Sequence, residues 1–175
     1  MRILLDATVL IGLGPVGELG LLTSFDGTLV CCPAVRQEVT TEPARTNLER
    51  FREAHDIGTD CPEEGPHLDR AAELLGEDEL SGDVQLVAAC LSARDADTSV
   101  ALVSDDRRLR TVADGLGATV TGTIGAIVRA VNGGLPASEG VELVRRLDDR
   151  GLHMTAELRH RAEELVRDAG DGGSG

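Results

Sequence analysis

Carboxylate side chains follow several short apolar runs of this chain, at the points where those runs stop. In an open parallel sheet, the carboxyl ends of the strands and the amino ends of the following helices face one crevice, where ligands bind. Carboxylates gathered there repel one another, and a hard divalent cation such as Mg²⁺ or Mn²⁺ relieves that repulsion. Such a cation lowers the pKa of a bound water and stabilises a phosphate under in-line attack. The acids that map to this edge are Asp6, Glu38 and the pair Asp105–Asp106, and Asp83 is a further candidate at a helix start with no visible preceding strand.

These acids differ in how strongly each supports a metal site. Asp6 ends an apolar strand, where a charge is costly to bury without a partner or a function. Asp83, Asp105 and Asp106 stand at helix starts, so each alone is more typical of a cap or of a partner for the helix dipole. Glu38 alone is typical of a solvated helix position. The prediction of a metal site therefore rests on these acids taken together. For the fourth acidic position of that site we favour Asp106 over Asp105.

Other catalytic chemistry has little support in the sequence. The four histidines show no pairing with a nucleophile, which argues against Ser–His or Cys–His machinery. The four cysteines, at positions 31, 32, 61 and 90, lack a C-x-x-C pair or a Cys/His spacing typical of zinc. We expect them to be reduced in a cytoplasmic chain, and Cys90 to lie in the core because it falls on an apolar helical face.

Strands alternate with helices along the part of the chain that must position these acids. Apolar runs predict strands at 3–5, 28–31, 100–103 and 118–121, and apolar residues at helical spacing predict helices starting near Ser81, Asp106 and Thr123. A further helix begins near Pro33, and others are expected at 68–75, 138–150 and 155–168. This alternation predicts an α/β fold, a three-layer α/β/α sandwich around a central parallel sheet.

The chain divides into unequal parts. We expect a Rossmann-like domain at 1–134, a C-terminal helical extension packed on it at 135–169, and a disordered tail at 170–175, where the sequence is rich in glycine. No stretch approaches the roughly 20 apolar residues that span a bilayer, and the N-terminal apolar run is too short for a secretory signal. These features predict a cytoplasmic protein that does not enter membranes.

The charge balance is strongly acidic. The chain has 31 acids and 17 bases, a net charge of −14, and every base is arginine. Acid excess without lysine, together with only two Phe and no Trp or Tyr, resembles the composition of proteins from salt-loving archaea. In molar salt the Debye length is about 3 Å, so such charge neither supports nor excludes nucleic acid as a partner.

Four segments together resemble the motifs of PIN domains. The run 4–11 resembles the opening strand and turn of that family, with Asp6 followed by a small residue and Thr8. The segments 35–39, 80–90 and 102–109 resemble the second, third and fourth motifs, with Glu38, Asp83 and the pair Asp105–Asp106 at the acidic positions. The segments 122–134 and 147–152 resemble the end of the domain and the C-terminal extension of an archaeal and bacterial subgroup.

This resemblance implies a metal-dependent ribonuclease directed at single-stranded RNA, often the toxin of a toxin–antitoxin pair. Asp6, Glu38 and Asp83 would be metal ligands, Asp106 or Asp105 would supply the fourth acid, and Mg²⁺ or Mn²⁺ would be the cofactor. A small antitoxin protein and a second copy of the chain are the implied partners. The subgroup often carries Glu where Asp83 stands, and the segment from Asp56 to Asp83, with ten acids and one Arg, adjoins the expected substrate path.

Hydroxyl and guanidinium groups surround the predicted acids. Thr8 and Ser104 stand where family members orient the site with small hydroxyl residues, although turn and cap chemistry explains them equally well. Arg107, Arg108 and Arg110 follow the fourth motif and Arg36 precedes Glu38, so they could contact phosphates, although a solvated helix face is the commoner role.

Three alternatives to an active nuclease can be compared with the sequence, and the first is the one that it leaves open. The first is a PIN scaffold that no longer cuts and acts as a nucleic-acid- or protein-binding regulator. The second is a receiver domain of the response-regulator type, which needs a lysine across its acidic pocket, and this chain has none. The third is a phosphatase of the haloacid dehalogenase type, which needs Asp two residues after Asp6, where Thr8 stands.

Overall fold

The computed structural model describes residues 1–150, 152 and 154–172. In these residues, four parallel strands form one sheet in the order β2-β1-β3-β4. Residues 3–5 of the central strand have no exposed surface, because helices cover both faces of the sheet. The edge strand β4 is more polar and partly exposed. The bounds of the strands are β1 Arg2–Leu5, β2 Thr28–Val30, β3 Val100–Val103 and β4 Thr119–Thr121.

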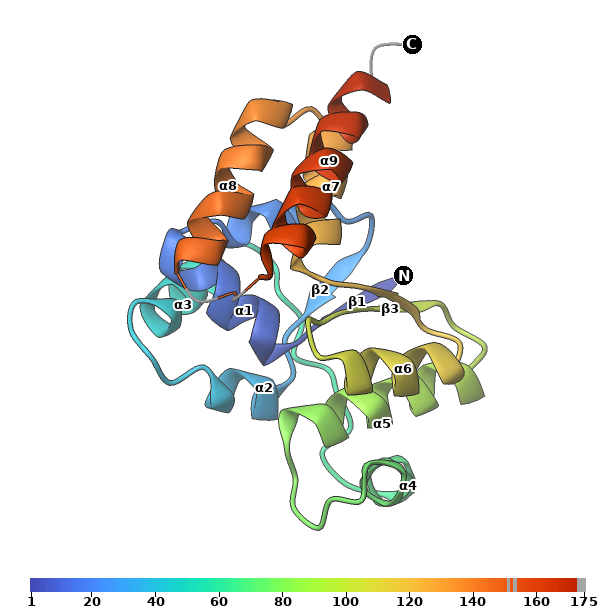
Figure 1. The fold of residues 1–175 in the computed structure, drawn as a ribbon. Coiled ribbons are helices and arrows are strands. Elements are labelled where there is room, and N and C mark those ends of the chain that lie inside the picture. Colours follow the sequence, from blue (N-terminus) through green and yellow to red (C-terminus); the bar gives the residue numbers. More distant parts are fainter. Residues whose placement is uncertain (151, 153, 173–175) are drawn as a thin grey trace.

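Helices lie on both sides of this sheet, as predicted for a three-layer fold. Helices α1 (Ala7–Leu13) and α7 (Thr123–Asn132) cover one side, and α5 (Gly82–Asp95) and α6 (Arg107–Gly115) cover the other (Figure 1). The other elements of the sheet domain are the 3₁₀ turns η1 Gly14–Val16 and η2 Leu19–Ser24, and the helices α2 Pro33–Glu38, α3 Ala44–Ala54 and α4 Pro66–Leu75. The predicted fold class is confirmed.

The strand order has a switch point between β1 and β3. From β1 the chain next forms β2 on one side, whereas β3 and then β4 extend the sheet on the other side. In open α/β sheets the crevice for ligands lies at such a point, outside the carboxyl ends of the two central strands. Asp6 and the segment Ser104–Asp106 directly follow these two strands.

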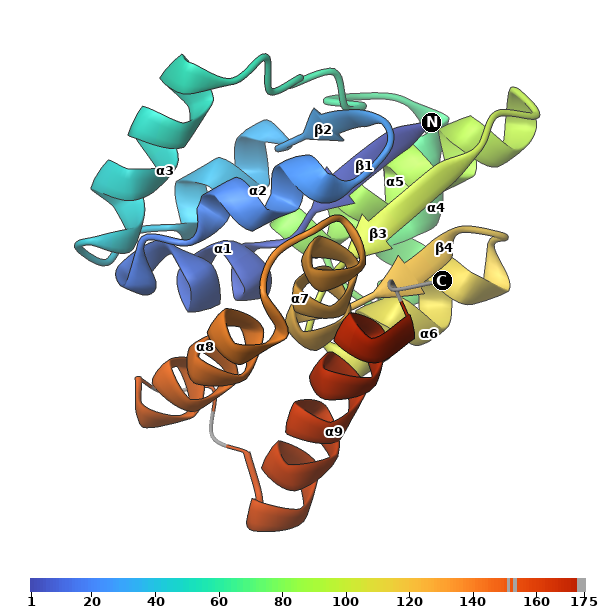
Figure 2. The same cartoon turned by 90° about the horizontal axis from the view of Figure 1, so that it is seen from above.

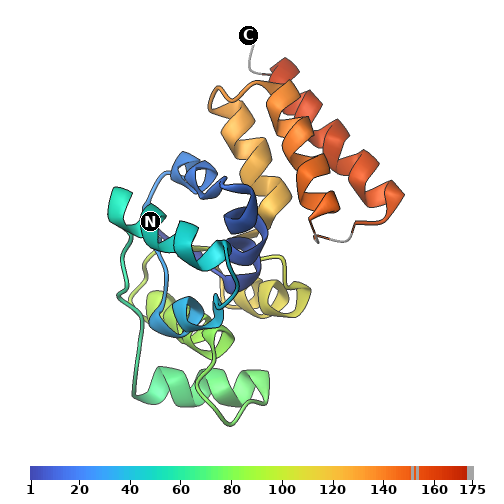
Figure 3. The same ribbon diagram turned by 90° about the vertical axis from the view of Figure 1, so that its left-hand side faces the viewer.

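The C-terminal extension consists of α8 (Ala137–Asp149) and α9 (Ala156–Gly172), which cluster with α7 beside the sheet (Figure 3). Gly140 of α8 allows this packing, because a Cβ there would lie 2.7 Å from a methyl of Val166 and 2.9 Å from one of Val131. The buried residues of the sheet domain and the extension form one continuous apolar cluster. A boundary at residues 134 and 135 therefore stays a prediction.

The last helix extends further than predicted. Helix α9 continues to Gly172, so the prediction is wrong for 170–172, and the last three positions of the chain, 173–175, lie outside the described residues. In the described part of the chain, no helix is both long and apolar enough to cross a membrane.

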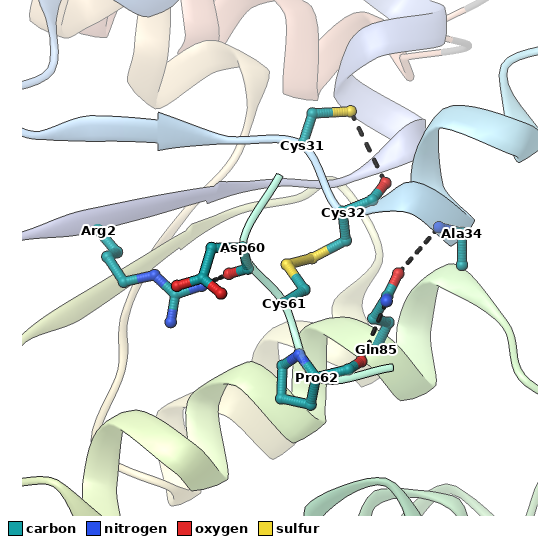
Figure 4. The surroundings of a disulfide bond; sticks show 8 residues. All are labelled: Arg2, Cys31, Cys32, Ala34, Asp60, Cys61, Pro62 and Gln85. Atoms are coloured by element: carbon teal, nitrogen blue, oxygen red, sulfur yellow. Dashed lines mark hydrogen bonds between the residues drawn. A yellow bond between two sulfur atoms is a disulfide. The ribbon is translucent and has the colours of Figure 1, made fainter. Parts of the chain in front are cut away.

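A disulfide joins Cys32, directly before α2, to Cys61 in the loop before α4 (Figure 4). The buried amide of Gln85 reinforces this junction, because it accepts a hydrogen bond from the Ala34 backbone NH at 2.8 Å and donates one to the Pro62 carbonyl at 3.0 Å. The expectation that all cysteines are reduced is wrong for this pair. Cys31 and Cys90 are buried free thiols, and burial raises the pKa of Cys31 to about 11 and that of Cys90 to about 12.

Candidate metal centre at the sheet edge

Asp6 lies at the centre of the carboxyl edge of the sheet and is only 2 % exposed. Its backbone NH donates to the Val103 carbonyl at 3.0 Å, which extends the pairing of β1 with β3 by one residue. Its Oδ2 accepts hydrogen bonds from Ser104 Oγ, at 2.7 Å, and from Thr8 Oγ1. The two hydroxyls that the sequence places beside the acids thus hold one carboxylate oxygen of Asp6, and this partly offsets the burial of its charge.

The loop after β3 separates the two adjacent acids. Asp106 caps α6, because its Oδ1 accepts from the Leu109 backbone NH at 2.7 Å. The Asp105 carboxylate instead accepts from the backbone NH and the hydroxyl of Thr123, at 2.8 and 2.6 Å. Asp105 therefore serves the start of α7, whereas Asp106 is the acid of this pair whose charge acts on Asp83.

Glu38, the last residue of α2, reaches across to the start of α5. Its Oε1 accepts from the Gly82 backbone NH at 2.6 Å. A Cβ at residue 82 would lie 2.7 and 2.9 Å from the two oxygens of Glu38, so any larger residue there would displace this carboxylate from its position. The sequence Ser81-Gly82-Asp83 thus combines a helix cap, a space for one acid and a second acid.

Asp83 lies in the first turn of α5, whose cap is Ser81 Oγ accepting from the Val84 backbone NH at 3.2 Å. No strand precedes α5 directly, which is why the sequence did not place Asp83 at the sheet edge. However, α5 leads into β3, and a helix that crosses back before a parallel strand begins at the carboxyl edge of the sheet. The direction of the helix therefore brings Asp83 to the same edge as Asp6.

The charges at this edge are strongly coupled. Burial, and to a smaller extent the repulsion of nearby carboxylates, together raise the pKa of Asp83 to about 6. In order of decreasing effect, these carboxylates are Asp6, Asp106, Glu77 and Glu38. A carboxyl group with its pKa raised in this way, in a crevice, is typical of a site that binds a cation or performs proton transfer.

The donor set fits a hard divalent cation, because it consists of carboxylate oxygens with an excess of negative charge. In the described residues, no three acidic, His or Cys side chains surround a single point closely enough to hold a metal ion as they stand. The structure thus brings Asp6, Glu38, Asp83 and Asp106 to one edge. Their assignment as ligands remains a prediction.

Two of the four arginines predicted near the phosphates have other partners. Arg36 binds both oxygens of Glu49, at 2.8 and 3.0 Å, and Arg108 donates to the Leu75 carbonyl and lies 3.9 Å from Glu77. The exposed Arg107 and the half-buried Arg110 have no side-chain hydrogen bond or ion pair within the described residues. These two remain the guanidinium groups of the fourth motif that are free to meet an anion.

Sequence reasoning missed two residues that shape this edge. Glu77 accepts from Ser81 Oγ at 2.6 Å and adds to the negative charge around Asp83. It lies in an acid-rich, aperiodic loop, where nothing distinguishes one acid from the next. Gln85 could have been noticed, because an amide between apolar neighbours on a buried helix face needs internal partners.

Comparison with known proteins supports the four motifs. A search of curated proteins finds no match, whereas a family model described as PIN domain matches residues 2–168. The match covers nearly the whole chain and confirms the predicted family. PIN domains are in general nucleases that act on nucleic acids and use divalent metal ions. On this sequence and fold evidence, the chain belongs to the PIN domain family.

Proposed function

We propose that this chain is a divalent-metal-dependent endoribonuclease that cleaves single-stranded RNA at the carboxyl edge of its sheet. The observation that carries the proposal is the raised pKa of Asp83, to about 6, beside four other carboxylates. A surface that only binds RNA has no need for acids placed where they repel each other and the phosphates. A metal ion between acids and phosphate reverses that repulsion, and a nuclease of this family has such an ion.

In this proposal Asp6, Glu38, Asp83 and Asp106 hold Mg²⁺ or Mn²⁺, which when bound supplies an activated water and charge stabilisation for phosphodiester hydrolysis. Ser104 and Thr8 orient the Asp6 carboxylate through their hydroxyls. Asp105 is a positioning residue that fixes the start of α7 through Thr123. We therefore assign the fourth acidic role to Asp106.

The test is cleavage of a labelled single-stranded RNA by the purified chain in molar KCl, with and without Mn²⁺ or Mg²⁺. We expect metal-dependent cleavage that EDTA stops and that Asp6→Asn abolishes. Asp114→Asn, which removes an equal charge from an exposed position of α6, serves as the matched control and should cleave like the parent chain. Cleavage that survives Asp6→Asn or EDTA would contradict the proposal.

The inactive scaffold is the competing function, and the same assay separates the two. Binding of metal and RNA without cleavage of any RNA or DNA would favour the scaffold. The absence of three converging side chains around one point, among the described residues, is the observation in its favour. However, these carboxylates can converge by rotation about a few side-chain bonds. A bound cation would remove the repulsion that keeps them apart.

The biological setting is also a proposal. We propose that the chain acts as a toxin neutralised by a small antitoxin protein, that it forms homodimers, and that it works in the cytoplasm of a salt-loving organism. A gene for a small protein directly beside this one, together with growth arrest that its product reverses, would support the toxin role.

The disulfide weighs against a reducing cytoplasm, because such bonds are uncommon there outside hyperthermophiles. Thiol labelling of the chain from intact cells would decide this point.

A further inference from the structure

A pocket of about 400 Å³ lies between α9 and residues at the carboxyl edge of the sheet and the start of α7. This volume is within the range of small-molecule sites in proteins. Figure 2 shows α9 beside α7. One wall comes from the sheet domain and the other from the C-terminal extension. Residues that matter for its chemistry are Arg110, Gly122 and Ile124 on the first wall and Leu158, Arg161 and Leu165 on the second.

The pocket adjoins the acidic edge through the loop that follows β3. Asp105 borders the pocket, and its neighbours Ser104 and Asp106 belong to the acidic edge. A Cβ at Gly122 would lie 2.5 Å from Asp105 Oδ1 and 2.9 Å from Arg110 Nη1. The guanidinium of Arg110 therefore lies against the backbone of residue 122, on the wall of the pocket.

The charge of the pocket is opposite to that of the chain. Arg110 and Arg161 both line it, and neither guanidinium forms a hydrogen bond or ion pair with another described residue. In a chain with 31 acids for 17 arginines, most described arginine side chains do have an acidic partner. Two unpaired guanidinium groups on one pocket are therefore suited to an anionic ligand.

Apolar side chains between these arginines suit a flat, poorly hydrated group. Leu158 and Leu165 are large apolar residues of α9 that are 52 % and 47 % exposed, on either side of Arg161 along one helix face. Ile124 faces them from α7. A nucleotide combines a base that packs on apolar surfaces or guanidinium planes with a phosphate that arginine binds. No aromatic side chain is among those that line the pocket.

We propose that this pocket binds one nucleotide of the single-stranded substrate, with its base against Ile124, Leu158 and Leu165 and a phosphate near Arg110 and Arg161. The inference rests on the proposed nuclease function, because it places the bound nucleotide next to the acidic edge. It gives the C-terminal extension a role in recognising substrate. It also predicts that the base at one fixed position relative to the cleaved bond affects binding more than the bases elsewhere.

The test measures binding separately from cleavage. In an Asp6→Asn background, the dissociation constant of a fluorescein-labelled single-stranded RNA is measured by anisotropy, with Mg²⁺, in the salt where the folded chain is most stable. Arg110→Gln combined with Arg161→Gln should raise this constant at least about tenfold. Arg45→Gln combined with Arg50→Gln, which changes the charge equally on α3, should change it less than about twofold. Equal losses in the two double variants would overturn the inference.

Two further measurements test whether the loss of binding comes from misfolding and whether the pocket binds a ligand other than RNA. Each variant must melt within a few degrees of its parent, and in the unmodified chain a photoreactive 4-thiouridine RNA should crosslink to the peptide that contains Leu158–Leu165. Crosslinks confined to other helices would overturn the inference. So would a pocket that binds an acidic peptide and excludes RNA. If the chain binds RNA through this pocket but cleaves nothing, the nuclease proposal fails and the binding site stands.

Discussion

Carboxylates are held in opposite ways at the sheet edge and in the C-terminal helices. At the sheet edge, burial and neighbouring acids raise the pKa of Asp83 to about 6. In the pair α8–α9, hydrogen bonds from Arg145 and Arg167 lower the pKa of Glu163 to about 2. The two oxygens of Glu163 accept hydrogen bonds from Nε and Nη2 of Arg145, at 3.0 and 3.1 Å, where α8 packs against α9.

This difference separates a structural acid from a functional one. Arginine side chains bind Glu163, and Arg159 likewise donates to the Asp148 carboxylate at 2.8 Å. The acids at the sheet edge receive neutral donors instead, from Ser104, Thr8 and the backbone of Gly82. A region that keeps its negative charge uncompensated is suited to a cation from solution. The following experiments test that contrast, from the largest expected effect to the smallest.

Amide substitution in the two regions should differ most in activity. Asp83→Asn should lower RNA cleavage about a hundredfold or more, because it removes an acid expected to bind the metal. Glu163→Gln should leave cleavage within about twofold, because its carboxylate acts on the helices of the extension. Initial rates with saturating Mn²⁺ measure both. A large loss in both variants would show that the extension also takes part in the chemistry.

Loss of the disulfide should have the largest effect on stability. Cys61→Ser opens a closure between residues 29 apart in sequence and should lower the free energy of unfolding by about 3–4 kcal/mol. The sheet edge then loses covalent support, whereas the ion pairs of the extension are untouched. Urea unfolding of the variant, and of the parent with and without a thiol reductant, measures the effect. A parent that is insensitive to reductant while Cys61→Ser is destabilised would point to packing of Cys61, without a role for the bond.

The same amide substitutions should have opposite effects on stability. Glu163→Gln should lower the free energy of unfolding by about 1–2 kcal/mol, a modest value because its two arginines are about half exposed. Asp83→Asn should leave it unchanged or raise it, because a repelled and partly buried charge disappears. Thermal and urea unfolding at pH 7 compare the two. A destabilised Asp83→Asn variant would mean that this carboxylate has a favourable partner in the folded chain.

The pH dependence of stability should show both effects, with opposite signs. The folded pKa of Asp83, about 6, lies above its ordinary 3.8, so its protonation stabilises the fold as the pH falls from above 6 towards 4. The folded pKa of Glu163, about 2, lies below its ordinary 4.5, so its contribution is present above 4.5 and is lost as the pH falls from there to 2. Unfolding curves of the metal-free chain should therefore show the first trend absent in Asp83→Asn and the second absent in Glu163→Gln.

Sequence reasoning located the parts of the site that local patterns encode. Asp6 and Asp106 could be placed because each follows a short apolar strand, and parallel strands end at a common edge. The preference for Asp106 over Asp105 could not be settled from the sequence, because it depends on the start of α7, where Thr123 binds the Asp105 carboxylate. Long-range contacts of this kind, like the pairing of Cys32 with Cys61, depend on the folded path of loops that carry no periodic signal.

The C-terminal extension shows the same limit of sequence-based prediction for contacts between whole helices. Its two helices were predicted within a few residues, because apolar spacing and caps are local. The pocket they form with the sheet domain was not, because Leu158 and Leu165 look like ordinary amphipathic residues until the position of α9 is known. Fold class follows from the pattern along the chain, whereas neighbours across the fold do not.

Calorimetric titration of Mg²⁺ into the chain tests the central claim most directly, when repeated in buffers of different ionisation enthalpy. At pH 6 an acid with a pKa near 6 is half protonated, so binding should release about half a proton from Asp83, and almost none at pH 8. Glu163→Gln should behave like the parent chain, and Asp83→Asn should lose the release at pH 6. Binding without any proton release at pH 6, or release that persists in Asp83→Asn, would contradict a metal site built on these acids.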